Sequence, residues 1–95
     1  MKIVLGPASE ELGEKIAELA NLEPVRVAYK TFPDGESYVR LKSSVKDEHV
    51  VIVQTTSAPQ NSRLIQLALL AGASKKTGAF RVTAVVPYLG YARQD

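Results

Sequence analysis

The sequence predicts an α/β fold, with a mostly parallel sheet, helices on both of its faces and a β-hairpin at about residues 25–42. Three observations lead to this class. Short apolar runs that favour strands alternate with two helical patterns, the order typical of parallel strands joined by helices. Two of these runs are apolar almost throughout, as in strands that are covered on both faces. A Pro-Asp-Gly tripeptide separates two further strand-like segments, as a turn between antiparallel strands would.

The first strand and the first helix follow each other closely. An apolar run at residues 3–5 ends before Gly6 and indicates a strand. Ser9 is the expected N-cap, because two glutamates follow it in the first helical turn, where negative charge is favourable. The helix is expected to end near Asn21. Its apolar face is predicted from helical spacing and contains Leu12, Ile16, Leu19 and Ala20.

The hairpin is predicted from alternation on either side of a turn. Val25, Val27 and Tyr29 alternate with other side chains, so residues 25–30 are interpreted as one half-buried strand. The Pro-Asp-Gly turn follows, and residues 38–41 form the returning strand, antiparallel to the first.

The second half of the chain continues with a strand, a helix and a strand. Residues 50–53 are apolar and mostly β-branched, which predicts a central strand. A polar loop precedes a helix that is expected from Arg63 to about Thr77, capped by Asn61 or Ser62 and ended by Gly78. The apolar face of this helix is predicted to contain Leu64, Leu67, Ala68 and Ala71. Another buried strand is expected at residues 81–86.

Composition and charge limit the possible partners. Twelve basic and ten acidic residues give a net charge of +2, and the basic residues are scattered, so no nucleic-acid partner is indicated. No apolar run is long enough to cross a bilayer, and the first residues do not read as a signal peptide. We therefore expect a cytoplasmic protein without a membrane partner. The lack of cysteine excludes disulfides and thiolate metal sites.

The tip of the hairpin carries side chains that a turn does not need. Phe32 could stack on a purine base, an interaction of roughly 1–3 kcal/mol, and the carboxylates of Asp34 and Glu36 could accept hydrogen bonds from an exocyclic amino group. Arg93 is the candidate cation for the other face of the base. Each motif is weak by itself, because Asp-Gly is common in hairpins and most Arg-Gln-Asp tripeptides are solvated loops. The sequence shows no phosphate-binding glycine loop, nucleophile–base pair or metal cluster.

Two motifs together are more specific. "FPDGESYVRL" at residues 32–41 and "RVTAVVPYLGYARQD" at residues 81–95 make the chain resemble the ribose-phosphate pyrophosphokinases. The resemblance extends through "KIVLG" and "VVIVQTTSAPQ", and the "FPDGE" form is similar to the bacterial and archaeal members. It implies a phosphoribosyltransferase-like three-layer fold. It also implies an enzyme that uses Mg²⁺ and transfers diphosphate from ATP to ribose 5-phosphate, giving phosphoribosyl pyrophosphate and AMP.

The resemblance also implies residue roles. In the family, the "FPDGE" loop reaches the adenine site from a neighbouring subunit, so a homodimer or a larger oligomer, often a hexamer, is implied. Phe32 would stack on adenine, and Arg93 would bind ATP from the other subunit, on the opposite face of the base. The full ATP-binding set that the resemblance implies is Phe32, Asp34, Gly35, Glu36, Arg93 and Gln94.

The resemblance covers roughly the first third of the family enzyme. We expect residues 1–95 to be its N-terminal phosphoribosyltransferase-like domain in truncated form, without the C-terminal catalytic domain. The family's catalytic lysine, magnesium-binding histidine and ribose-phosphate loop would lie beyond Asp95, so no catalytic or metal residue is expected in this segment, and this segment alone is predicted to be inactive. Two alternatives stay open: a non-catalytic regulatory homologue, and a stand-alone nucleotide-binding or assembly module.

Overall fold

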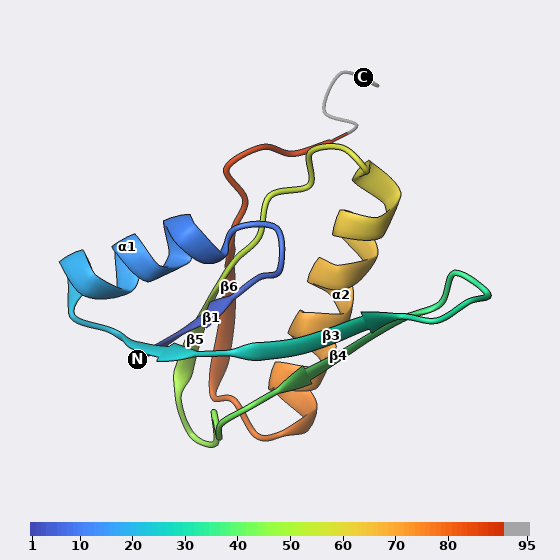
Figure 1. The fold of residues 1–95 in the computed structure, drawn as a ribbon. Helices are drawn as coiled ribbons and strands as arrows, with labels where there is room; N and C mark the ends of the chain where they lie inside the picture. The colour runs from blue at the N-terminus through green and yellow to red at the C-terminus, as the bar shows by residue number, and fades with distance from the viewer. Residues whose placement is uncertain (91–95) are drawn as a thin grey trace.

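The computed structural model describes residues 1–90, and residues 91–95 lie outside the described part. Figure 1 shows the arrangement of its helices and strands. In chain order they are β1 (Lys2–Leu5), α1 (Glu10–Ala20), β2 (Glu23–Val25), β3 (Val27–Thr31), β4 (Ser37–Leu41), β5 (His49–Val53), α2 (Gln60–Lys76) and β6 (Arg81–Val85). No helix among residues 1–90 is long and apolar enough to span a membrane.

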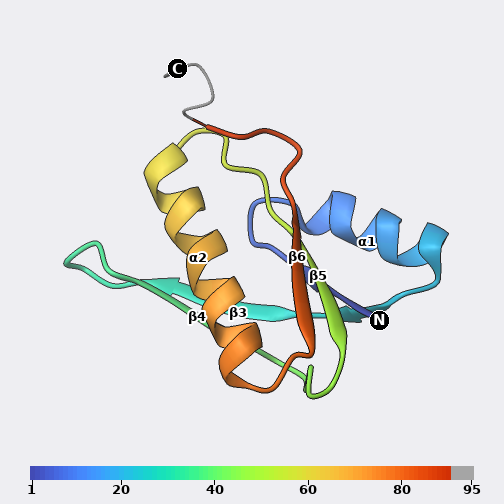
Figure 2. The ribbon, with the colours of Figure 1, turned by 180° about the vertical axis from the view of Figure 1, so that it is seen from behind.

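The main sheet is parallel and has the strand order β2-β1-β5-β6. Because successive side chains of a strand point to opposite faces, β1 contributes to two cores. Ile3 and Leu5 pack with Ala17 of α1, whereas Val4 belongs to the cluster that contains Leu70 of α2. The two helices therefore cover opposite faces of the sheet (Figures 1 and 2), which confirms the predicted fold class.

The hairpin forms a separate antiparallel sheet of β3 and β4, paired from Val27 with Leu41 to Thr31 with Ser37. Val39 and Leu41 pack against the α2 side of the core, and the far end of the hairpin extends past α2 (Figure 1). The predicted hairpin is confirmed, but the single strand expected at residues 25–30 is wrong. Val25 lies in β2 and pairs in parallel with Val4 of β1, and the chain changes sheets at Arg26.

Helix α1 begins after Ser9, as predicted, but the Ser9 hydroxyl does not cap it. The hydroxyl oxygen instead accepts a hydrogen bond from the backbone N–H of Thr55 at 2.9 Å, which ties the start of α1 to the loop after β5. The predicted apolar face is only partly correct. The helix packs through Ile16 and Ala17, whereas Leu19 is 88% exposed.

Helix α2 begins at Gln60, three residues before the predicted start, with Pro59 in the N-cap position. Its buried residues are Gln66, Leu70 and Ser74, and Leu64 and Ala68 of the predicted face are exposed. The prediction failed because polar residues occupy two of the three buried positions, so apolar periodicity indicated a rotated face. Leu67 and Ala71 do pack against the core.

Gly78 follows the end of α2 with a φ of +100°, a conformation that favours glycine, so its predicted role is confirmed. Strand β6 follows it. This strand was expected to be buried, but four of its five residues are exposed. Among the described residues β6 pairs only with β5 and forms the edge of the sheet.

Candidate functional site

The tip of the hairpin is closed by its own backbone. The N–H of Gly35 donates to the carbonyl of Phe32, and the N–H of Phe32 donates to the carbonyl of Glu36, both at 2.8 Å. Gly35 has a φ of +91°, and no atom lies within 4 Å of the position that a Cβ would take. Glycine is therefore favoured here for its backbone conformation and not for lack of space.

The ring of Phe32 is held at the tip by its strand neighbours. Tyr38 packs against it edge to face, with 6.4 Å between ring centroids and 62° between ring planes. The ammonium of Lys30 lies over the Phe32 ring, 5.0 Å from the centroid. The Phe32 residue remains 38% exposed, which leaves ring surface available for stacking.

Lys30 and Tyr38 were missed as site residues from the sequence. They are directly paired across the hairpin, with Lys30 opposite Tyr38. The signal that could have found them is the register of the hairpin, since a turn centred on Pro-Asp-Gly places these two positions opposite each other.

The two carboxylates at the tip have different surroundings. Asp34 accepts a hydrogen bond at Oδ1 from the backbone N–H of Glu36 at 3.0 Å, so part of its role is to fix the turn. Glu36 is exposed, and no ion pair joins its carboxylate to a cation within residues 1–90. Glu36 is therefore the better placed of the two to contact a ligand.

A hollow of about 370 Å³ lies between the hairpin tip and the N-terminal half of α2. Polar groups of the tip line one side of it, and the helix contributes both polar and apolar side chains. The lining residues are Gly35, Glu36, Ser37, Asn61, Ser62, Ile65 and Leu69. Of the tip residues predicted from the sequence, Gly35 and Glu36 thus line a hollow that helix α2 shares, whereas Phe32 and Asp34 do not line it.

A second region of interest is the carboxyl edge of the parallel sheet, where ligands bind in open α/β folds. Gln54, at the end of β5, is fully buried there. Its Oε1 accepts a hydrogen bond from the N–H of Ala8 at 2.9 Å, and its Nε2 donates to Gln66 Oε1 at 3.0 Å and to the carbonyl of Arg63 at 3.3 Å. This single amide connects the loop after β1 to helix α2.

The segment after β6 is tied to the same edge by Thr56. The Thr56 N–H donates to the carbonyl of Tyr88 at 2.8 Å, and its hydroxyl lies 3.0 Å from the same carbonyl and 2.7 Å from the N–H of Gly90, which donates to it. Arg93 and Gln94, three and four residues later, lie outside the described residues. The structure therefore describes the hairpin-tip residues of the predicted ATP site, but their contact with ATP and their meeting with Arg93 and Gln94 both stay predictions.

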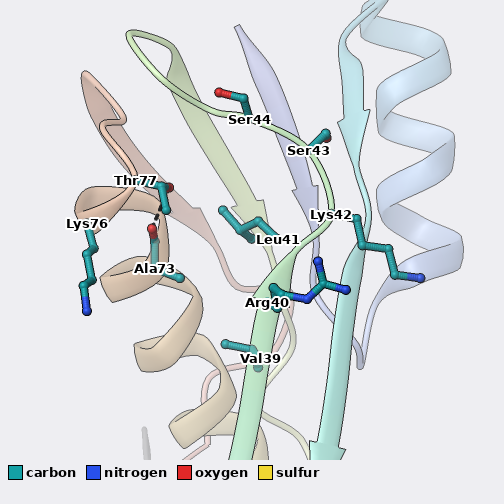
Figure 3. Close-up of a pocket in the computed structure, with 9 residues that line it drawn as sticks. All are labelled: Val39, Arg40, Leu41, Lys42, Ser43, Ser44, Ala73, Lys76 and Thr77. Atoms are coloured by element: carbon teal, nitrogen blue, oxygen red, sulfur yellow. Dashed lines mark hydrogen bonds between the residues drawn. The ribbon is translucent and has the colours of Figure 1, made fainter.

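A larger hollow, of about 520 Å³, lies between the end of β4 and the C-terminal half of α2 (Figure 3). Three cationic side chains line it, but they do not converge. Lys76 extends from the helix on one side, whereas Arg40 and Lys42 point away on the other side of the strand (Figure 3). Among residues 1–90, none of the side chains predicted to bind ATP lines this hollow.

Within residues 1–90, no group of three or more histidine, cysteine, aspartate or glutamate side chains could hold a metal ion. The described residues thus do not fit a Mg²⁺ site of their own. The predicted use of Mg²⁺ stays an expectation, with its ligands expected beyond Asp95.

A family model described as the N-terminal domain of ribose phosphate pyrophosphokinase matches residues 1–95. The chain is 46% identical over all of its 95 residues to the ribose-phosphate pyrophosphokinase of Saccharolobus solfataricus, and 43% identical to that of Rhodopirellula baltica. These matches cover 33% and 30% of the two relatives, so the chain spans about a third of their length.

Solved structures agree with this result. The phosphoribosylpyrophosphate synthetase of Mycobacterium smegmatis matches 99% of the chain with a TM-score of 0.83 and 31% identity, over 32% of its own length. A purine phosphoribosyltransferase from Pyrococcus horikoshii matches 96% of the chain with a TM-score of 0.68, over 65% of its own length. At 16% identity, this second match shows the phosphoribosyltransferase fold alone.

Proposed function

Because this chain belongs to the ribose-phosphate pyrophosphokinase family, as its N-terminal domain, we propose that it is part of an enzyme that makes phosphoribosyl pyrophosphate. The reaction transfers diphosphate from ATP to ribose 5-phosphate and leaves AMP. The contribution of these residues is to bind the adenine end of ATP, in a cytoplasmic enzyme that works as a homodimer or a larger oligomer. The Mg²⁺ ligands and the catalytic groups would come from other parts of the enzyme.

The observation that carries this proposal is the exposed ring of Phe32 on a hairpin that extends past α2 (Figure 1). The Lys30 ammonium lies over the ring, so adenine would stack on the face opposite to it. The carboxylate of Glu36 would accept a hydrogen bond from the exocyclic amino group of adenine. Asp34 and Gly35 would keep the turn in the conformation that presents these groups.

A base that is stacked on Phe32 has a second face to cover. We propose that Arg93 of a neighbouring subunit covers it as a cation over the π-system, with Gln94 beside it. The extension of the hairpin away from the body of its own domain supports a site shared between subunits (Figure 1).

Calorimetry with ATP and ADP on the purified chain tests the adenine contact. Phe32→Ala removes a stacking interaction of roughly 1–3 kcal/mol and should weaken binding by about 5- to 150-fold. Phe80→Ala is the matched control, because Phe80 is the chain's other phenylalanine, is 74% exposed and lies just before β6. Equal binding by the Phe32→Ala variant and the unmodified chain would refute the assignment.

A mixing experiment tests whether the site spans two subunits. Phe32→Ala and Arg93→Ala chains each lack half of every site, so each should bind ATP weakly alone. A mixed dimer has one site with both residues intact, and mixing the two variants should therefore restore part of the binding. If Phe32 and Arg93 met within one chain, mixing would restore nothing.

An activity assay distinguishes this proposal from the alternative that the 95-residue chain is an active enzyme by itself. The purified 95-residue chain, given ATP, ribose 5-phosphate and Mg²⁺, should form no phosphoribosyl pyrophosphate, because we place the catalytic groups outside it. Turnover that follows the purified chain and survives removal of contaminating enzyme would contradict this expectation.

A further inference from the structure

Thr56 lies in a stretch that the sequence predicts to be a polar loop, yet it is only 1% exposed. It stands two positions after Gln54, at the carboxyl edge of the sheet. Its hydroxyl donates to the carbonyl of Tyr88 at 3.0 Å and accepts the N–H of Gly90 at 2.7 Å. One buried oxygen thus joins the loop after β5 to the segment after β6.

The contact with Gly90 is made by this hydroxyl and not by the backbone of the loop. Backbone hydrogen bonds connect the two segments at Gln54 with Val85 and at Thr56 with Tyr88. The N–H of Gly90 is buried and donates to the side chain of Thr56. Without the hydroxyl, the segment would remain attached as far as Tyr88 and lose its attachment at Gly90.

The packing at Gly90 is close. A Cβ at this position would lie 2.7 Å from the Thr56 carbonyl oxygen and 2.9 Å from Cγ of Gln60, the first residue of α2. The absence of a side chain lets the backbone approach both segments. The close packing and the hydrogen bond to Thr56 together hold the backbone of Gly90 in place.

Gly90 precedes Arg93 by three residues. Three extended residues span at most about 11 Å, so the position of Gly90 limits where the Arg93 side chain can reach. We propose that Thr56 is a positioning residue for ATP binding: its hydroxyl fixes the point from which the chain runs to Arg93 and Gln94. This inference rests on the proposed function, in which Arg93 and Gln94 contact ATP.

Thr56→Val tests the inference, because valine keeps the shape of threonine and lacks the hydroxyl. The buried N–H of Gly90 then loses its acceptor, and we expect ATP binding about tenfold weaker, the equivalent of about 1.4 kcal/mol. Thr56→Ser retains a hydroxyl and should bind ATP nearly as well as the unmodified chain. Thr55→Val is the matched control, because the Thr55 hydroxyl lies 3.5 Å from both of its hydrogen-bond partners and does not contact Gly90.

Two further measurements separate positioning from loss of stability. The Thr56→Val substitution should accelerate amide hydrogen exchange more at Gly90 than at Ile52. Ile52 lies in the sheet, where exchange requires unfolding of the whole domain. Val50→Ala removes buried volume at the amino half of β5, so it should lower stability and leave the ATP affinity of the folded protein unchanged. Unchanged exchange at Gly90 in Thr56→Val would overturn the inference, whatever happens to ATP binding.

Arg93→Ala distinguishes failure of the inference from failure of the proposed function. If Arg93→Ala weakens ATP binding and Thr56→Val does not, the positioning role is wrong and the proposed site stands. If Arg93→Ala leaves binding unchanged, the proposed site is wrong and the positioning role falls with it. In an Arg93→Ala background, Thr56→Val should cost clearly less than in the unmodified chain, since most of its effect passes through Arg93.

Discussion

Gln54→Leu should destabilise the protein strongly, although Gln54 begins a stretch that reads as a polar loop. Leucine is close to glutamine in size, so the substitution removes hydrogen bonds without leaving a large cavity. Gln54 is fully buried and binds three groups: the N–H of Ala8, the carbonyl of Arg63 and Oε1 of Gln66. None of these three groups gains a new partner from leucine.

The size of the effect follows from which groups stay unpaired. Oε1 of Gln66 keeps a hydrogen bond from the Arg63 guanidinium at 3.3 Å, so its loss is partial. The partly buried N–H of Ala8 loses its partner, where an unsatisfied group costs about 1–3 kcal/mol when it is fully buried. With the smaller losses at Arg63 and Gln66, we expect a decrease of about 2–4 kcal/mol in the free energy of unfolding. A domain of this size is stable by roughly 5–14 kcal/mol, so the variant would lose a large share of its stability.

Urea unfolding followed by circular dichroism measures this change, and thermal unfolding should show a Tm lower by about 10–25 °C. The double variant Gln54→Leu/Gln66→Leu provides the internal control. Replacing both glutamines by leucine leaves no unpaired amide at position 66. The stability losses of the single variants Gln54→Leu and Gln66→Leu should therefore sum to more than the loss of the double variant. A single-variant loss below about 1 kcal/mol, or strictly additive losses, would refute the view that this network stabilises the carboxyl edge.

Two further predictions concern glycines and charge. Gly72→Ala should stabilise the protein by about 0.5–1 kcal/mol, because Gly72 is exposed within α2 and a Cβ there meets no atom within 4 Å. Gly13→Ala in α1 should not give this stabilisation, because the new Cβ would lie 2.7 Å from Leu5 Cδ2. An equal increase in the free energy of unfolding at both positions, measured with urea, would count against the packing described for α1. The N-terminal ammonium, 3.0 Å from Glu48, holds the pKa of that carboxyl below its ordinary value. The small stabilisation from this ion pair is therefore present above the ordinary pKa of glutamate and lost as the pH falls through the lowered pKa of Glu48. An NMR titration should show the pKa of Glu48 rise when the Met1 amine is acetylated. An unchanged pKa would contradict the ion pair as the cause of the lowering.

The sequence was sufficient for the elements whose signals are local. The Pro-Asp-Gly turn specified the hairpin, and the positive φ of Gly78 ends α2 at the predicted position. The change of sheet at Arg26 was not predictable in this way. Val25 and Val27 lie in the same buried cluster although their strands belong to different sheets, so alternation continued across the boundary.

The carboxyl edge was hidden from the sequence for a different reason. Gln54 and Thr56 read as polar loop residues, because their burial depends on partners 9–46 residues away, such as Ala8, Gln66 and Gly90. Composition cannot reveal such partners, since a glutamine that is buried and one that is solvated look the same in a sequence. A polar stretch at the end of an apolar strand is the signal that could have marked the region, because parallel strands bring their carboxyl ends together.

The two parts of the candidate site therefore respond differently to substitution. Phe32 and Glu36 are exposed, and the turn that presents them is closed by backbone hydrogen bonds, so changing these side chains should alter ligand binding with little loss of stability. Thr56 is buried and joins two loops, so we expect its substitution to change stability and binding together. A binding loss at Phe32 can be assigned directly to a ligand contact. A binding loss at Thr56 can be assigned to positioning only after the fraction of folded protein has been measured, which is why its test includes hydrogen exchange and a core control.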